Sequence, residues 1–353
     1  MTRRQGNHNP RIPALPKENN TGRHGIYYHV SFYDLQAANH ITMLPNKTKS
    51  LYIASLKKVL EHHVKDYWII NCSNVKPHVY YLDFIANMWR DGDVDIDKHL
   101  KGYIASYYGE DHITEIAECF RQYWQHALKY GEHEDDHAGE QFANHERELL
   151  ISQFMKDKSQ RAEDLLWACD DKTLEGQVEW YKKLCAKGKE SYEQLLCCYE
   201  KLDARLIDHE RILFEDSLYL QAEIYYNCYS GALLMCEALC EAFAGEYKLA
   251  FYKAGKARKA YLRADRDMRD REHGKWHDFY ANECLTDIKQ TAWVIEGLMS
   301  YIRNLGDGPH FYLWQREFLY SEEDRRVVLV CNMENHLKDL ELYELMEERY
   351  GDM

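Results

Sequence analysis

Polar side chains gather where two short hydrophobic runs end, early in the chain. The runs occupy residues 25–32 and 67–77, and each combines β-branched or aromatic residues with polar groups. The polar residues are His29, Ser31, Asn71, Asn74 and Lys76. Imidazole, hydroxyl, amide and ammonium groups together donate and accept hydrogen bonds and neutralise an anion. These residue types predict a binding site for a polar ligand, provided that the fold brings the two runs together.

The segment between the runs predicts how they come together. Its apolar residues recur at three- and four-residue spacing, which is typical of an amphipathic helix. They are Leu51, Tyr52, Leu56, Val59, Leu60 and Val64. Two strands joined by a helix form a parallel pair, because parallel strands need a long return connection. Ligands bind at the C-terminal ends of parallel strands, so the polar residues are expected at one edge of the sheet.

The composition restricts the class of protein and the kind of partner. The chain has 353 residues, 45% hydrophobic and 29% charged, as expected for a globular protein of about two domains. A formal net charge of -14 argues against nucleic acid or an anionic membrane as the main partner. An anionic ligand would need a locally basic pocket. The sequence contains no apolar run of about 18 residues, so no membrane span is expected.

The cysteines and histidines predict neither a cofactor nor a bound metal. The 11 cysteines are scattered without a C-x-x-C pair, so reduced thiols and a cytoplasmic location are expected. Residues 133–137 read His-Glu-Asp-Asp-His and match the H-E-x-x-H pattern of zinc proteases. The two central acidic residues, flanked by Gly131 and Gly139, instead indicate a charged turn. A metal or ligand role near the site is the alternative for this segment.

The remainder of the chain is predicted to be helical. Only Pro309 falls after Pro77, and Ser321–Asp324 is a candidate capping box for the last helix. Helices are expected near residues 80–89, 113–127, 149–154, 173–200, 203–244, 246–264, 283–304 and 324–348. The predicted fold class is therefore mostly α, with a small α/β portion followed by a large helical domain.

Three segments of the chain resemble glycoside hydrolase family 115, the xylan α-1,2-glucuronidases. They are Gly25-Ile-Tyr-Tyr-His29, Trp68-Ile-Ile-Asn-Cys-Ser-Asn-Val-Lys-Pro77 and His273-Gly-Lys-Trp276. In that family the first two patterns lie on late strands of a (β/α)8 barrel of the TIM type, and the third lies in the helical domain that follows. Their order and approximate spacing agree over nearly the whole chain.

The resemblance implies a domain division. Residues 1–105 would be the C-terminal portion of an incomplete (β/α)8 barrel, and residues 106–353 an α-helical domain. The chain would then be a fragment, since a pair of parallel strands needs neighbours on both edges and cover on both faces. Asn74 departs from the family pattern, in which Asp is common. An amide cannot carry the negative charge that a carboxylate would supply at this position.

The implied activity is the release of (4-O-methyl)glucuronic acid side chains from xylan or xylo-oligosaccharides, with inversion. Inversion requires one carboxyl group as acid and a second as base. The family's candidates for these roles lie mostly in segments that this chain lacks. Asp34 and Asp83 are the weak catalytic candidates that remain, and each is weighed against a solvated or helix-capping role.

Substrate-binding residues are better represented. A glucuronate carboxylate calls for a cation, which Arg11, Arg23 or Lys76 would supply unless they are ordinary surface cations. One of Tyr27 and Tyr28 would face the ligand, because neighbouring strand residues alternate faces, but the sequence does not tell which. The other expected sugar contacts are His29, unless it is a core histidine, Asn71 and Asn74.

A mixed-charge stretch, residues 265–277, contains the third family segment. Alternating charges usually mark an exposed, ion-paired helix face. The resemblance adds a second interpretation, in which His273, Lys275 and Trp276 lie near the active site or at a homodimer contact. The expected ligand is a glucuronoxylan-type oligosaccharide. The alternative to an enzyme is a non-catalytic helical binding or assembly module whose strands dock onto a partner's sheet.

Overall fold

The computed structural model describes residues 22–30, 38–45, 52–132, 137–308, 310–326 and 336–351. Three of the predicted site residues, Arg11, Ser31 and Asp34, lie outside these ranges, as do residues 133–136 of the H-E-x-x-H segment.

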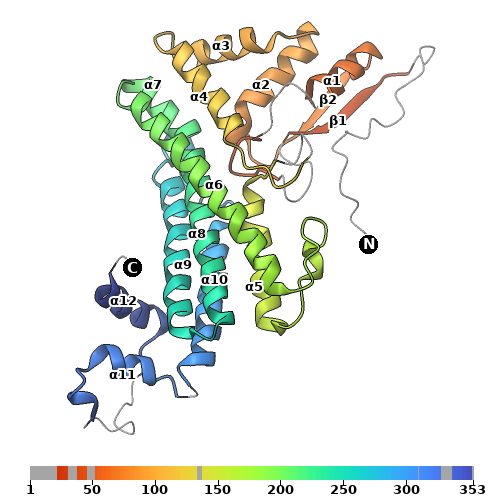
Figure 1. Ribbon diagram of the computed structural model, residues 1–353. Helices are drawn as coiled ribbons and strands as arrows, with labels where there is room; N and C mark the ends of the chain where they lie inside the picture. The colour runs from red at the N-terminus through yellow and green to blue at the C-terminus, as the bar shows by residue number, and fades with distance from the viewer. Residues whose placement is uncertain are drawn as a thin grey trace. The chain divides into compact units, whose positions relative to one another are not determined.

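The sheet in the described part of the chain is a parallel pair, β1 (Gly25–His29) and β2 (Tyr67–Asn71). Gly25 pairs with Tyr67 and His29 with Asn71. The return connection contains α1 (Tyr52–Glu61), which lies beside the two strands in Figure 1. The predicted parallel crossover is therefore confirmed, whereas the complete barrel stays a prediction.

Three helices come directly after β2 in the chain. They are α2 (Val75–Asp91), α3 (Ile96–Tyr107) and α4 (Ile113–Gln125). The helices predicted near residues 80–89 and 113–127 are confirmed by α2 and α4.

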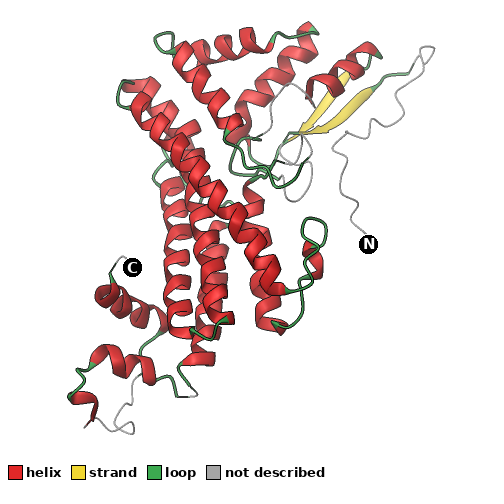
Figure 2. Cartoon of the chain, viewed as in Figure 1, coloured by secondary structure: helices red, strands yellow, loops and turns green. Residues whose placement is uncertain are grey.

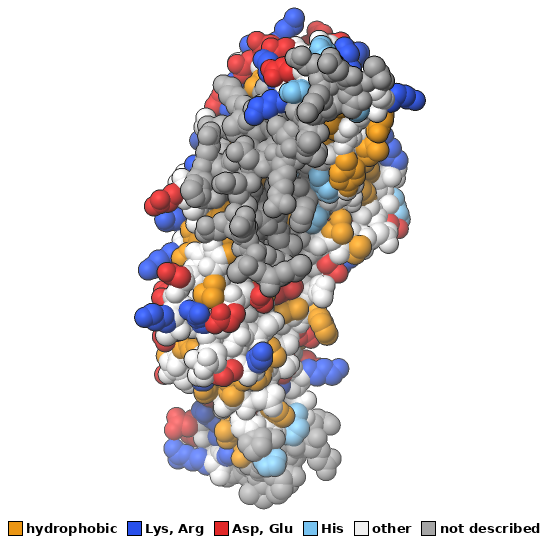
Figure 3. Space-filling view, turned by 90° about the vertical axis from the view of Figure 1, so that its right-hand side faces the viewer, with side chains coloured by type: hydrophobic (Ala, Val, Ile, Leu, Met, Phe, Trp, Pro, Cys, Tyr) orange, Lys and Arg blue, Asp and Glu red, His pale blue; other side chains and the backbone are white. Residues whose placement is uncertain are grey.

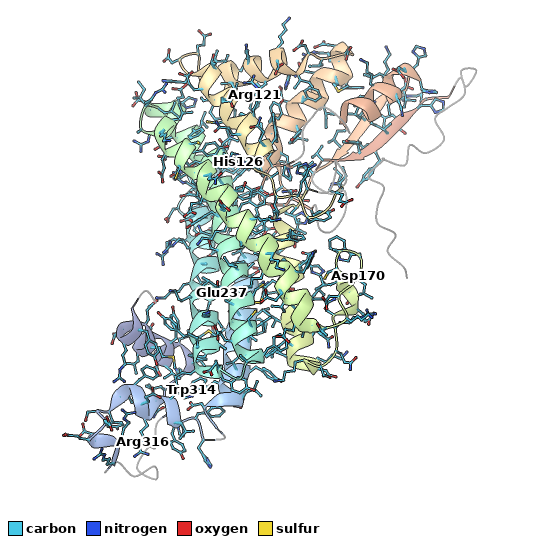
Figure 4. The ribbon with its side chains drawn as sticks, viewed as in Figure 1. Arg121, His126, Asp170, Glu237, Trp314 and Arg316 are labelled. Atoms are coloured by element: carbon cyan, nitrogen blue, oxygen red, sulfur yellow. The ribbon has the colours of Figure 1, made fainter. Side chains whose placement is uncertain are left out.

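The helix α3 has no counterpart in the sequence-based prediction. Only Leu100 and Ile104 of its residues are fully buried, so its apolar pattern is short. Its start is defined by Asp95, whose carboxylate accepts a hydrogen bond from the backbone N–H of Lys98 at 2.8 Å. Arg121 of α4, labelled in Figure 4, lies 3.6 Å from the Asp97 carboxylate of α3.

The two faces of the β1–β2 sheet have different surroundings. Tyr27, Tyr67 and Ile69 lie on one face, and their side chains are exposed. Tyr28 lies on the opposite face, near enough to buried Tyr81 of α2 for an electrostatic interaction. One face is therefore packed against helices, and the other is open. Hydrophobic side chains also gather at the surface in the upper part of Figure 3.

The rest of the described chain is helical, as predicted, and Figure 2 shows how little strand the molecule contains. The longer helices are α5 (Glu140–Asp157), α6 (Leu174–Asp203), α7 (Asp208–Phe214), α8 (Leu220–Phe243), α9 (Tyr247–Arg269), α10 (Ile288–Gly306), α11 (Leu313–Leu319) and α12 (Asp339–Tyr350). The short ones are η2 (Glu163–Leu165), the π-helical turn η3 (Glu215–Tyr219), η4 (Gly274–Trp276) and η5 (Asp324–Arg326). None of the described helices is both long and apolar enough to cross a membrane.

The helical stretch predicted over residues 203–244 is helical from Asp208 to Phe243, as α7, η3 and α8, but it begins later than predicted and is not one regular helix. Ile207 has an extended backbone and Asp208 a positive φ of 47°, so the chain leaves the helical conformation between α6 and α7. Beyond α7 the helix widens into η3 before α8 begins. An apolar periodicity does not reveal such interruptions, because the apolar residues on both sides keep helical spacing.

The prediction for the last helix is also corrected. The backbone N–H of Asp324 donates to Ser321 Oγ at 3.2 Å, so the capping pair forms at the start of η5, while residues 327–335 lie outside the described ranges. The C-terminal helix α12 begins at Asp339, where the Glu341 carboxylate accepts from the backbone N–H of Lys338 at 2.8 Å.

The chain divides into two compact units, each assembled from three segments. The first contains Met1–Phe142, Lys187–Tyr226 and Asp267–Thr286, and the second contains Ala143–Ala186, Asn227–Arg266 and Asp287–Met353. These units are not the predicted domains. The domain boundary near residue 105 comes from the family resemblance, and it stays a prediction.

Each unit has its own core. In the first unit, the ring of buried Tyr80 lies 5.3 Å from those of Tyr81, Tyr103 and Phe120. In the second unit, Arg147 is fully buried, and its Nη2 donates to Thr291 Oγ1 at 3.1 Å.

Candidate functional site

The open face of the sheet carries polar groups at the C-terminal ends of its strands. Asn71 Nδ2 donates a hydrogen bond to Tyr27 Oη at 2.6 Å, across from strand to strand. His29 is paired with Asn71 in the register and lies on the same face. Tyr27 is 66% exposed, whereas Tyr28 faces the helices. Of the two tyrosines between which the sequence could not choose, Tyr27 is therefore the one that a ligand on the open face can reach.

A second group of polar side chains lies just beyond the strand ends. His40 Nδ1 and Ser73 Oγ are 2.7 Å apart, and Asn74 Nδ2 donates to the carbonyl oxygen of His40 at 2.9 Å. Burial lowers the pKa of His40; the nearby Glu283 opposes this shift, and His29 adds to it. The lowered pKa favours the neutral imidazole, which can both donate and accept a hydrogen bond.

The loop that contains His40 is held by a buried carboxylate. Glu140, the first residue of α5, accepts hydrogen bonds from the backbone N–H groups of His40, Ile41 and Thr42, the last two at 3.0 and 2.9 Å. The hydroxyls of Thr42 and Thr286 also donate to it. Burial raises the pKa of Glu140 to about 7, although these hydrogen bonds act in the opposite direction. The carboxylate fixes the loop beside the strand ends.

Lys76 lies in the first turn of α2, directly after the strand end. Its Nζ donates to the carbonyl oxygen of Arg271 at 3.2 Å and lies 4.9 Å from the ring centre of Tyr280 and 5.7 Å from that of Trp276. Such positions over aromatic rings stabilise a cation. Burial lowers the pKa of Lys76, while the negative charges of Asp216 and Glu272 oppose the shift.

Asp216, in the π-helical turn η3, is a half-buried carboxylate close to this lysine. Burial raises its pKa, and the positive charges of Lys76, His273 and Arg271 oppose the shift. His273 Nε2 lies 3.3 Å from the Asp216 carboxylate. A π-helical turn inside a helix often marks a functional site. The structure thus brings Lys76, Asp216, His273 and Trp276 together in the first unit.

The remaining predicted residues lie elsewhere. Arg23 is exposed, two residues before β1. Asp83 lies on α2 and pairs with His99 Nε2 at 2.7 Å, so it belongs to the helix surface. Lys275 is exposed, with its Nζ 5.5 Å from the ring centre of Trp276. His137, the end of the H-E-x-x-H segment, forms a β-bridge with Lys129.

The described residues contain no group of three or more His, Cys, Asp or Glu side chains that could hold a metal ion.

Sequence reasoning missed several of these residues. His40 and Ser73 follow β1 and β2, so the rule that placed Asn71 and Asn74 at the sheet edge could have included them. Glu140 and Asp216 reach the site from about 100 or more residues away along the chain, and no local pattern marks them.

Comparison with known proteins gives one match, and it falls within the first unit. Residues 4–133 match the model of glycosyl hydrolase family 115. Comparison with curated proteins and with solved structures gives no match. The matched range contains both strands and the strand-end residues from Tyr27 to Lys76, while His273–Trp276 lies outside it. The family resemblance is thereby confirmed for residues 4–133, the part of the chain that matches the family model.

Proposed function

We propose that this chain is part of a glycoside hydrolase that releases (4-O-methyl)glucuronic acid from xylan-type oligosaccharides, and that its strand-end residues form part of the sugar-binding surface. The observation that supports this most directly is the open sheet face, where the exposed Tyr27 is hydrogen-bonded to the partly buried Asn71. The family match of residues 4–133 supports the class of reaction.

In this proposal the polar groups have separate roles. Tyr27 and Asn71 bind sugar hydroxyls, because a phenol and an amide each donate and accept. Neutral His40 adds a further donor and acceptor. Lys76 supplies positive potential for a uronate carboxylate, and Asp216 holds that ammonium in place. Arg23 is the more exposed cation and the candidate for a direct bidentate contact.

The acid and base of an inverting reaction are not assigned to the described residues. Asp83 is engaged by His99 on α2, and Asp34 stays a prediction. We propose that β1 and β2 belong to a larger (β/α)8 barrel, because the open face would otherwise leave Tyr27, Tyr67 and Ile69 in water. The catalytic carboxylates would then lie on other strands of that barrel.

The test is binding followed by turnover. Purified, folded chain is titrated with a xylo-oligosaccharide that carries one glucuronic acid branch, and released acid is measured by chromatography. Asn71→Ala is expected to weaken binding at least fivefold. Asn304→Ala, which removes an exposed amide from α10, is the matched control and should have no effect. Equal affinities of both variants and of the unmodified chain would contradict the proposed surface.

A non-catalytic assembly module is the second candidate. It is favoured by the same open sheet face, whose exposed Tyr67 and Ile69 are apolar enough to pair with another protein. A homodimer contact through His273–Trp276 stays a prediction. Sugar binding that depends on Asn71 would favour the enzyme, whereas concentration-dependent self-association without sugar binding would favour the module.

A further inference from the structure

The connection between β1 and α1 contains a buried segment, residues 38–45, that is neither helix nor strand. All residues of this segment except His40 are buried. Connecting segments usually lie at the surface, because the backbone N–H and C=O groups of a buried segment need partners. His40 is thus the partly exposed residue of a segment that the protein otherwise encloses.

Side chains of distant helices supply the partners that this segment needs. The backbone N–H of Met43 donates to Gln221 Oε1 at 2.6 Å, and the Met43 carbonyl oxygen accepts from Tyr123 Oη at 2.6 Å. Other backbone groups of the segment bond to the side chains of Asn74, His78, Tyr81 and Glu140. All of these residues belong to the first unit. The backbone that carries His40 is therefore fixed from several sides, as expected for a residue that must be held in position.

The His40 ring is paired with a serine. His40 Nδ1 lies 2.7 Å from Ser73 Oγ, and both side chains are partly exposed. A serine hydroxyl that donates to a neutral imidazole at such a distance is the arrangement of a nucleophile and its general base. Burial lowers the pKa of His40, while the nearby Glu283 opposes this shift. The negative charge of Glu283 therefore favours the imidazolium that forms when His40 takes the serine proton.

Ser73 lies in the short turn between β2 and α2, next to the start of the helix. Asn74 occupies the N-cap position of α2, but its side chain donates to the carbonyl oxygen of His40 and does not cap the helix. The first backbone N–H groups of an uncapped helix stay available to an external acceptor. Val75, the first residue of α2, is 55% exposed. Backbone N–H groups directly after a nucleophilic serine, in a strand-to-helix turn, stabilise the oxyanion in serine hydrolases.

We propose that Ser73 and His40 form a nucleophile–base pair that hydrolyses esters of short-chain carboxylic acids. Ser73 Oγ bonds to the ester carbonyl carbon while its proton passes to His40 Nδ1. The bond from that carbon to the alcohol oxygen then breaks, and His40 returns the proton to the departing alcohol. Water hydrolyses the acyl-serine in the same way, which releases the acid and restores the hydroxyl of Ser73. This activity is independent of the proposed glycoside hydrolysis.

Labelling of the serine tests the pair in the unmodified chain. The folded chain is treated with a fluorophosphonate, which reacts with activated serines, and the modified peptides are identified by mass spectrometry. Ser191 is the internal control, because it is also partly exposed but its Oγ donates to the backbone carbonyl of His126 at 2.9 Å. We expect Ser73 to be labelled and Ser191 not, and labelling of Ser73 to slow by roughly 100-fold in His40→Gln.

Hydrolysis of p-nitrophenyl acetate is the second measurement. We expect a burst of p-nitrophenol stoichiometric with the chain, which Ser73→Ala removes while it lowers the steady rate by at least about tenfold. Ser191→Ala should leave both unchanged, and thermal melting checks that each variant folds.

Two results would overturn the proposal. One is labelling of Ser73 no faster than that of Ser191, which needs no variant to be observed. The other is ester hydrolysis that Ser73→Ala leaves unchanged, because an imidazole would then act without the serine. Release of glucuronic acid without labelling of Ser73 would remove the nucleophile–base pair while the proposed function stands.

Discussion

The Glu140 carboxylate accepts a hydrogen bond from the backbone N–H of Ile41 at 3.0 Å, joining the start of α5 to a loop about 100 residues earlier in the chain. Because the same carboxylate also satisfies the backbone of Thr42 and the hydroxyl of Thr286, it serves several buried donors at once.

Replacement of Glu140 by alanine would leave these donors buried without an acceptor. We expect Glu140→Ala to lower the free energy of unfolding by about 3–5 kcal/mol, since each buried unsatisfied group costs about 1–3 kcal/mol and the site relaxes in part. Denaturant titration measures the change. Glu322→Ala, at an exposed position, is the control. A loss no greater than that of the control would show that the loop does not depend on this carboxylate.

The same group makes stability depend on pH. Burial raises the pKa of Glu140 to about 7 in the folded state, above its ordinary value of 4.5. The stabilisation that arises from this raised pKa is therefore fully present below about pH 4.5 and is lost as the pH rises through 7. Compared with Glu140→Gln, whose amide does not titrate, the unmodified chain should lose roughly 3 kcal/mol over this interval. A free energy of unfolding that stays level or rises, relative to that of Glu140→Gln, as the pH is raised from 4.5 to 7 would contradict the assignment.

The environment of Lys76 allows a matched comparison with Lys275, since both ammonium groups lie near the ring of Trp276. Lys76 is half-buried and also bonds to the Arg271 carbonyl, whereas Lys275 is exposed. We expect Lys76→Met to lower the free energy of unfolding by about 1–2 kcal/mol. Lys275→Met should leave it unchanged. Thermal and urea unfolding distinguish these outcomes, and equal effects would remove any special role for Lys76.

The thiols should differ sharply in reactivity. Cys197 and Cys284 are exposed, while burial raises the pKa of Cys119 to about 12 and that of Cys236 well above its ordinary value. The thiolate is the reactive form. Iodoacetamide at pH 8 should therefore modify Cys197 and Cys284 in the folded protein, and Cys119 and Cys236 only after denaturation. Peptide mass mapping measures this, and early modification of Cys236 would contradict the buried position.

The parts of the fold that follow from local pattern could be predicted from the sequence. The parallel pairing of β1 and β2 follows from two β-rich runs and the helix between them. Which of Tyr27 and Tyr28 lies on the open face of the sheet did not follow, because alternation fixes opposite faces without saying which face is covered. That choice depends on Tyr81 of α2, which packs on the side of Tyr28.

Only the part of the candidate site that lies at the strand ends could be predicted from the sequence. Asn71, Asn74 and Lys76 follow from the position of the strand end. The partners that complete the site, Glu140 and Asp216, come from distant helices, and a single sequence contains no periodicity that connects them to the sheet. The break before α7 was predicted a few residues too early, because Asp208 adopts a positive φ that its residue type does not demand.

The π-helical turn η3 has one consequence for how this chain tolerates length changes. A π turn holds one residue more than an α-helical turn. Deleting a single residue from Glu215–Tyr219 would let α7 and α8 merge into one regular helix. The turn would then complete one revolution with one residue fewer, so α7 and α8 would keep their relative orientation. A one-residue deletion here would be absorbed without breaking the helix, yet it would shift Asp216, inside the turn, relative to Lys76.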